Sequence, residues 1–276
     1  MTEGFGVRLR ERVGERGALC VGVDPSPHLI ESFEREDSVE SLEYVALRLV
    51  EAATQTASCV KPQVAFFERY GARGYGVLER VIREARAGGL LVIADAKRGD
   101  IGSSNEGYAE AWLGENSPLA SDAVTVSPYL GVNSLQPFVE RTGTGRGLFV
   151  LAATSNPEGR SLQGARTAEG PRVFDEVLAA VARWNEPSPS VGNVGVVLGA
   201  SAPRGEFSPR QVRGPILVPG VGAQGGALDQ VGRLLEGVEK GTVIVSLSRA
   251  LVEGGTTPRQ LATTAARWRD ALAESL

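Results

Sequence analysis

The chain has 276 residues and a formal net charge of -4 at pH 7, and this length fits either one large α/β barrel domain or two ordinary domains. Its Lys and Arg residues are scattered along the sequence, so they form no basic field that would attract nucleic acid. No apolar run reaches the roughly 20 residues of a membrane span, and the chain does not open with the pattern of an export signal. We therefore expect a cytoplasmic protein that binds neither nucleic acid nor a membrane.

Apolar runs rich in β-branched residues recur along the chain and predict eight strands. They span residues 18–23, 59–66, 90–94, 123–127, 147–152, 194–199, 215–218 and 242–247. The two cysteines, Cys20 and Cys59, stand at the beginnings of the first two runs, where a reduced thiol packs as a small hydrophobe. They indicate no disulfide framework.

Between these runs, apolar residues recur three or four positions apart and predict amphipathic helices, as at Leu42, Val45 and Leu49. Strands that are apolar throughout are buried on both faces, and helices between them make them parallel. Eight such units predict an α/β protein with a closed (β/α)8 barrel, the TIM-barrel fold, as a single catalytic domain over residues 1–276. A doubly wound open sheet is the alternative, but its ligands gather at one switch point, whereas polar motifs end at least six of these strands.

The sequence LVIADAKRGD places the charged residues Asp95, Lys97 and Asp100 at the end of the third apolar run. Side chains two positions apart on a strand point the same way, so Asp95 and Lys97 share one face. Charged groups at the end of a buried strand cost several kcal/mol to desolvate unless they pair. A structural ion-pair network is one interpretation of this cluster, and a catalytic cluster is the sharper one.

Catalytic groups of (β/α)8 barrels project from the carboxyl ends of the strands. Applied to this chain, that rule gathers eight polar residues around one mouth. They are Asp24, Lys61, Asp95, Lys97, Asp100, Ser155, Gln224 and Arg249. Each alone has an ordinary structural explanation, such as a turn or helix cap. Their convergence predicts a single active site.

The segment VPGVGAQGG, residues 218–226, satisfies the G-x-G-x-x-G pattern of dinucleotide-binding proteins. That interpretation fails because the pattern needs an early βαβ unit and an acidic residue about 20 positions later. A Gly-rich turn after the seventh strand, followed by Arg249 after the eighth, instead indicates a phosphate site. Backbone N–H groups would receive the phosphate oxygens, and the guanidinium would supply a charged fork. The predicted ligand is a phosphomonoester.

The segment DAKRGDIGSS, residues 95–104, resembles the D-x-K-x-x-D signature of the orotidine 5'-phosphate decarboxylase family, in the form of its longer bacterial branch. Further similar segments are VGVDPSP at 21–27, VKPQVAFFE at 60–68, SPYLG at 127–131, LAATSNPEG at 151–159 and VPGVGAQGG at 218–226. This resemblance implies a carboxy-lyase of pyrimidine biosynthesis that converts orotidine 5'-phosphate to UMP and CO2 without a metal or cofactor.

The resemblance also implies roles for individual residues. Lys97 would stabilise the carbanion and protonate C6 of the pyrimidine, and Asp95 would lie near the departing carboxylate. Lys61 and Asp100 would complete an alternating Lys/Asp chain that keeps Lys97 charged. In the family, the residues matching Asp100 and Ser104 reach into the partner's site, which implies a homodimer with shared sites. The implied substrate-binding residues are Asp24 for the ribose, Ser155 and Pro219 for the base, Gln224 and Arg249 for the phosphate, and Ser104.

Two other functions remain open. A 3-keto-L-gulonate 6-phosphate decarboxylase-like enzyme shares D-x-K-x-x-D but needs Mg²⁺ held by further carboxylates, and here Pro62 and Gln63 follow Lys61 instead. A non-catalytic barrel that binds nucleotide phosphates would bind UMP without turning over a substrate. A metal requirement in the assay would support the first, and binding without turnover would support the second.

Overall fold

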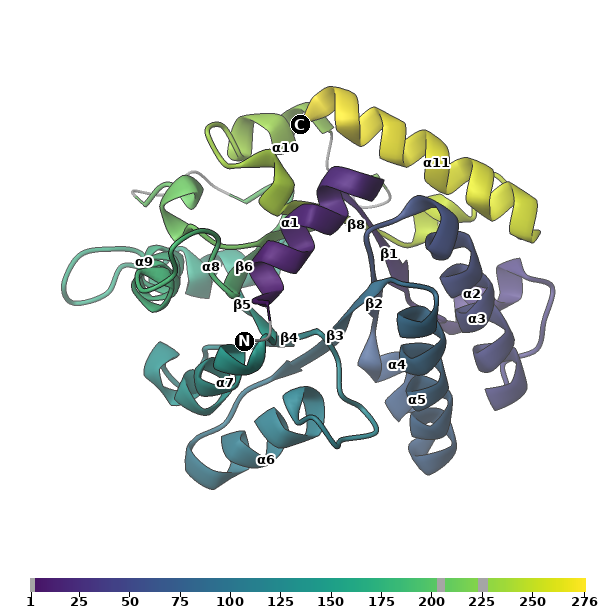
Figure 1. Cartoon of the computed structure of the whole chain (residues 1–276), viewed down its shortest axis with the longest axis horizontal. Coiled ribbons are helices and arrows are strands. Elements are labelled where there is room, and N and C mark those ends of the chain that lie inside the picture. The colour runs from purple at the N-terminus through teal and green to yellow at the C-terminus, as the bar shows by residue number, and fades with distance from the viewer. Residues whose placement is uncertain (1–2, 203–206, 223–227) are drawn as a thin grey trace.

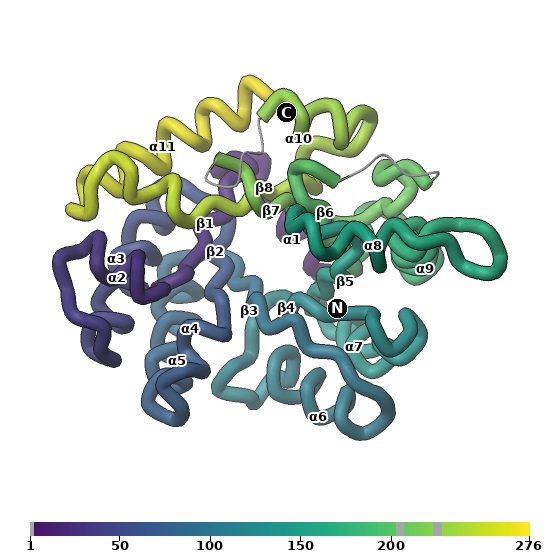
Figure 2. The backbone as a smooth tube through the Cα atoms, turned by 180° about the vertical axis from the view of Figure 1, so that it is seen from behind, coloured from purple at the N-terminus to yellow at the C-terminus, as the bar shows by residue number. Residues whose placement is uncertain are grey.

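The eight predicted strands are all present, and they close into a parallel barrel in the order of the sequence (Figures 1 and 2). The computed structural model describes residues 3–202, 207–222 and 228–276. The strands are β1 (Leu19–Val23), β2 (Cys59–Pro62), β3 (Leu91–Arg98), β4 (Ala123–Val126), β5 (Gly147–Ala153), β6 (Val194–Leu198), β7 (Ile216–Pro219) and β8 (Val243–Leu247). Closure comes from pairing of β1 with β8, so the chain forms the predicted (β/α)8 barrel rather than an open sheet.

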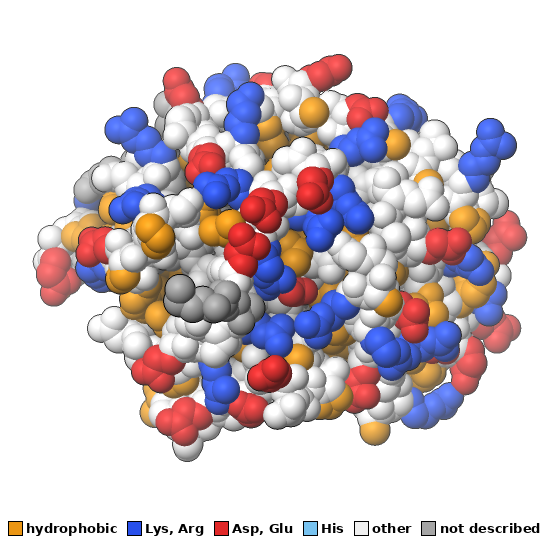
Figure 3. Space-filling model, viewed as in Figure 1, with side chains coloured by type: hydrophobic (Ala, Val, Ile, Leu, Met, Phe, Trp, Pro, Cys, Tyr) orange, Lys and Arg blue, Asp and Glu red, His pale blue; other side chains and the backbone are white. Residues whose placement is uncertain are grey.

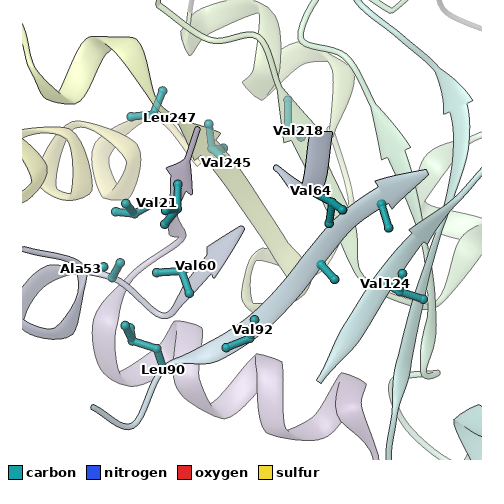
Figure 4. Packing of buried hydrophobic residues seen from close by; sticks show 14 of the residues in the cluster. Val21, Ala53, Val60, Val64, Leu90, Val92, Val124, Val218, Val245 and Leu247 are labelled. Atoms are coloured by element: carbon teal, nitrogen blue, oxygen red, sulfur yellow. The ribbon is translucent and has the colours of Figure 1, made fainter. Parts of the chain in front are cut away.

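Helices surround the barrel and cover its outer face (Figure 1). They are α1 (Phe5–Arg16), α2 (Pro27–Ser32), α3 (Val39–Thr56), α4 (Val64–Glu68), α5 (Gly71–Ala87), α6 (Gly102–Leu113), α7 (Gln136–Arg141), α8 (Arg160–Gln163), α9 (Val173–Asn185), α10 (Leu228–Leu234) and α11 (Pro258–Ser275). The predicted apolar series on α3 is buried, which confirms its periodicity. Figure 4 shows Val21, Val60 and Val92 of three neighbouring strands beside Ala53 of α3, all within the buried core.

A second, smaller core fills the inside of the barrel, and α1 closes it at the amino ends of the strands. Both cysteines belong to this inner core as free, buried thiols, as predicted. Phe5 of α1 is fully buried and meets Phe149 of β5 edge to face, with ring centroids 5.9 Å apart. Only glycine fits at Gly147, because an added Cβ would lie 2.3 Å from the Phe5 ring. The carboxyl ends of the strands are thereby left as the open end of the barrel.

Six strands match their predicted bounds to within one residue at each end, and two, β2 and β3, differ by more. The second was expected to extend to residue 66, but it ends at Pro62, and Val64–Glu68 forms α4. The ring of Pro62 removes the N–H that would continue the ladder, and burial of Val64 and Phe67 stabilises the helical turn instead. The third strand was expected to end at residue 94, but it extends to Arg98, so Asp95 and Lys97 lie on the strand itself and Asp100 follows it.

Acidic and basic side chains are interspersed over the face of the molecule seen in Figure 3. This distribution agrees with the scattered charges of the sequence, and no field of one sign covers that face. Among the residues that the structure describes, no helix is both long and apolar enough to span a membrane.

Candidate active site

A cavity of about 320 Å³ opens at the carboxyl ends of the strands. Seven of the ten residues predicted for the site line it. They are Asp24, Lys61, Asp95, Lys97, Ser155, Pro219 and Arg249. Strands β1, β2, β3 and β7 carry or directly precede five of these residues, which explains how positions 195 residues apart in sequence meet at one mouth. Asp100 and Ser104 do not line the cavity, and Gln224 lies outside the described residues.

The centre of the cavity is a Lys–Asp–Lys cluster. Lys61 Nζ lies 2.5 Å from Asp95 Oδ2, and both side chains are buried. Lys97 Nζ lies 2.6 Å from the other carboxylate oxygen, Asp95 Oδ1, and its side chain is 43% exposed. Two of the three lysines in the chain therefore share one carboxylate, and the cluster carries a net charge of +1 when all three groups are ionised. An anionic substrate group at this cavity would meet an attractive potential.

Burial and charge act in opposite directions on these groups. Burial alone would raise the pKa of Asp95, but the charges of Lys61 and Lys97 and their hydrogen bonds hold it well below its usual range. Burial alone would lower the pKa of Lys61, but Asp95 and Asp24 raise it above its usual value. Asp95 and Lys61 thus stay ionised at neutral pH.

Asp24, which follows β1, has a different environment. Burial is the main reason that the pKa of Asp24 is raised, and the nearby charge of Asp95 raises it further. The charge of Lys61 and a hydrogen bond with Ser248 oppose this increase. Its Oδ1 atom is buried and accepts no hydrogen bond from the described protein groups, although the residue lines the cavity. Such an acceptor is suited to a ligand hydroxyl, because a bound hydroxyl would supply the missing donor.

Two cavity residues, Thr125 and Gln63, were not selected by the sequence analysis. The Thr125 hydroxyl accepts a hydrogen bond from the Lys97 backbone N–H at 3.0 Å and donates one to Asp95 Oδ1 at 2.9 Å. The Gln63 amide satisfies both its neighbours when its nitrogen donates to the Asp95 carbonyl oxygen at 2.7 Å and its oxygen accepts from Lys97 Nζ at 3.1 Å. The available signal was a lone threonine within the apolar run 123–127, on a strand next to that of Asp95.

The other end of the cavity is formed by the turn after β7 and the residues after β8. Gly220 and Gly222 have φ angles of 86° and 75°, which residues with a side chain rarely adopt. Arg249 is exposed and forms no ion pair with any residue that the structure describes. A guanidinium beside a glycine turn, with no acidic partner among the described residues, can bind a phosphate group.

Asp100 and Ser104 lie beyond the cavity, on the segment that leads from β3 into α6. Asp100 Oδ1 accepts a hydrogen bond from the Ile101 N–H at 2.8 Å, and within the described part of the chain Asp100 forms no ion pair with either cavity lysine. Asn105 Oδ1 accepts from the Asp100 N–H at 2.9 Å, and its Nδ2 donates to the Asp100 carbonyl at 2.6 Å. Ser104 is exposed on α6. Within one chain the predicted alternating Lys/Asp series therefore has three contacting members rather than four.

The fold and the cavity define this chain as a (β/α)8-barrel protein with a charged site at the carboxyl ends of its strands. Residues 17–264 match the model of the family described as "Orotidine 5'-phosphate decarboxylase / HUMPS family". The chain belongs to this orotidine 5'-phosphate decarboxylase family, as the sequence motifs predicted.

Relatives with this name are similar to the chain over most of its length. It is 47% identical over 254 residues to orotidine 5'-phosphate decarboxylase of Salinispora tropica, covering 92% of this chain and 91% of the relative. It is 50% identical over 234 residues to that of a Nocardioides species, covering 83% and 85%. The crystal structure of an orotidine 5'-phosphate decarboxylase from Streptomyces avermitilis has a TM-score of 0.93 at 44% identity, covering 99% of this chain and 96% of that one.

Proposed function

We propose that this chain converts orotidine 5'-phosphate to UMP and CO2 through the Lys61–Asp95–Lys97 cluster. Decarboxylation agrees with the family and with relatives that bear this name at 45% to 50% identity. The observation that carries the mechanism is the 2.6 Å contact between Lys97 Nζ and a buried, ionised Asp95. It presents an ammonium group beside a buried carboxylate at the mouth of the barrel.

In the proposed step, the bond between C6 and the carboxylate breaks, CO2 leaves, and the electron pair remains on C6. The ammonium of Lys97 stabilises the developing negative charge and transfers its proton to C6, which completes UMP, and Lys97 then regains a proton from water. Preorganised charges of this kind act without reorganising during the reaction and supply a large part of the rate enhancement in many enzymes. The proposal includes no metal or cofactor.

Asp95 and Lys61 would act by orienting Lys97 and balancing its charge. Asp95 holds the Lys97 ammonium at one oxygen, and Lys61 neutralises the other. Asp95 would then lie next to the departing carboxylate. The net positive charge of the cluster favours binding of the substrate carboxylate before CO2 leaves.

The remaining cavity residues would bind the nonreacting parts of the substrate. Asp24, with its unsatisfied Oδ1, would accept hydrogen bonds from ribose hydroxyls. Ser155 and Pro219 would contact the pyrimidine, and Arg249 would bind the phosphate together with Gln224. Binding energy from the phosphate end can be used to close the site around the reacting carbon.

The proposal includes a cytoplasmic homodimer in which each barrel is a single catalytic domain. Exposed apolar side chains lie next to Asp100 in sequence and on the neighbouring loop after β4: Ile101 is 62% exposed, Tyr129 74% and Leu130 52%. Large apolar groups exposed near one another are typical of a protein interface. Burial of this surface against a second copy would carry Asp100 and Ser104 toward the partner's cavity.

The Mg²⁺-dependent alternative has less support. Within the described residues, no group of three His, Cys, Asp or Glu side chains converges in a way that could hold a metal ion. The relatives at 45% to 50% identity are named orotidine 5'-phosphate decarboxylase. The binding-only alternative leaves the shared Asp95 carboxylate and its two lysines without a role.

The deciding experiment follows the ultraviolet absorbance of orotidine 5'-phosphate incubated with purified protein and EDTA. The wild type should remove the orotate band, Lys97→Ala should not, and Lys240→Ala, which removes an exposed lysine outside the cavity, should behave as the wild type. A wild type that is inert with EDTA but active with Mg²⁺ would favour the metal-dependent alternative. Binding of UMP without any turnover would favour the binding protein.

A further inference from the structure

The backbone of Lys97 is held in an unusual conformation where β3 meets β4. The two strands pair regularly at Ala94 with Val124 and again at Arg98 with Val126. Four steps along β3 therefore match two along β4, and the extra residues of β3 form a bulge. Lys97 lies in this bulge with a φ angle of 47°, in the left-handed region that residues with side chains seldom adopt. Something must stabilise this conformation in the folded protein.

Thr125 supplies that stabilisation through a ring of hydrogen bonds that begins and ends at Lys97. The Lys97 N–H donates to Thr125 Oγ1 at 3.0 Å. Because an amide can only donate, the single hydroxyl proton of Thr125 is directed to its other neighbour, Asp95 Oδ1, at 2.9 Å. Asp95 Oδ1 in turn accepts from Lys97 Nζ at 2.6 Å, which closes the ring.

The position of Thr125 makes this ring effective. Thr125 is 1% exposed, so water does not compete for its hydroxyl, whereas the Lys97 side chain is 43% exposed and has room to move. The hydroxyl contacts both the backbone of Lys97 and the carboxylate that holds its ammonium group. A single residue on β4 thereby constrains both ends of the lysine.

We propose that Thr125 is a positioning residue that fixes Lys97 for proton delivery; this rests on the proposed function, in which Lys97 protonates C6. Thr125 acts through Lys97 and Asp95 without reacting itself, so its loss should lower the rate of the chemical step. It contributes little to holding the substrate, because the ribose and phosphate groups are assigned to other residues. Misplacement of a reacting group by about 1 Å can lower a rate about 100-fold.

The test compares three variants of the full-length protein. Thr125→Val is nearly isosteric and removes the hydroxyl, and we expect kcat for orotidine 5'-phosphate to fall roughly 10- to 100-fold, with KM and the Kd of UMP changed by less than about threefold. Thr125→Ser restores a hydroxyl and should return kcat to within about threefold of the wild type. Thr56→Val is the matched control, because Thr56 is also buried but its hydroxyl donates to the Ala52 carbonyl within α3.

Several outcomes would overturn the inference. The inference is wrong if Thr125→Val keeps the wild-type kcat, or if its loss of activity comes from a change in KM alone. It is also wrong if Thr125→Ser is as slow as Thr125→Val. If Thr125→Val does not fold, Thr125→Ala against Thr125→Ser gives the same comparison. An inert wild type would refute the proposed function instead, and a crystal structure of Thr125→Val would then test the ring itself. Lys97 keeping both its positive φ and its Asp95 contact in that variant would refute the positioning role.

Discussion

Replacing Lys61 by methionine tests whether the folded protein depends on the buried Lys61–Asp95 pair. The two groups lie 2.5 Å apart, and only 6% and 8% of their side chains are exposed. Methionine keeps most of the aliphatic stem but removes the ammonium group, so one oxygen of a buried carboxylate loses its charged partner. Removing one partner of a buried pair costs about 3–5 kcal/mol. Because Asp95 Oδ1 keeps Lys97 and Thr125, we expect the free energy of unfolding to fall by about 3 kcal/mol.

The size of this loss should depend on pH. The folded-state pKa of Asp95 lies below its unfolded value of about 3.9, so its stabilising contribution is present above that value and is lost as the pH falls through the folded pKa. In Lys61→Met the largest opposing charge is gone, so the pKa of Asp95 rises and the folded variant gains a proton at a higher pH than the wild type does. The stability difference between the two proteins should therefore be largest near neutral pH and shrink below about pH 5.

Urea unfolding of the wild type and Lys61→Met between about pH 4 and pH 8 measures this difference. Lys240→Met is the control, because Lys240 is exposed, and a surface substitution should change the free energy of unfolding by less than about 0.5 kcal/mol. The reasoning is refuted if Lys61→Met is as stable as the wild type at neutral pH. It is also refuted if the stability difference grows on acidification.

Two further predictions concern the closed end of the barrel and the dimer. Phe5→Ala removes a fully buried ring that packs on Phe149 and should lower the free energy of unfolding by about 3–5 kcal/mol, while kcat stays at the wild-type value. An unchanged urea midpoint would show that packing of α1 against the end of the barrel does not stabilise the fold. Mixing Lys97→Ala with Asp100→Ala should restore activity, up to about a quarter of the wild type, because half of randomly exchanged dimers carry one intact site. No recovery despite demonstrated subunit exchange would remove the shared-site proposal.

The barrel was predictable because its strands are mostly apolar and do not alternate between apolar and polar residues. Runs such as 194–199 and 242–247 can only be buried on both faces, and eight of them with helices between allow few folds. The end of the second strand was not predictable from the same property, since Val64 and Phe67 are equally apolar in a buried helical turn. The plugging helix α1 was missed, although Phe5, Leu9 and Val13 carry a helical spacing and are all buried.

Site residues were predictable from the sequence where a charged residue interrupts an apolar run. Lys61, Asp95 and Lys97 interrupt buried strands, and the structure brings them into direct contact. The role inferred for Thr125 could not be predicted from the sequence, because it depends on a bulge that shifts the register between β3 and β4. No local sequence pattern indicates that shift. The placement of Asp100 away from the cavity within one chain likewise depends on how Asn105 holds the loop.

The scarcity of lysine in this chain has an experimental consequence. Of its 29 basic residues only Lys61, Lys97 and Lys240 are lysines, and the others are arginines, which stay protonated at any ordinary pH. A sample labelled with nitrogen-15 only at lysine would therefore give three side-chain resonances, two from the cavity and one from an exposed reference at Lys240. Proton occupancy of the two cavity ammonium groups can then be followed residue by residue as a nucleotide is titrated into the intact protein.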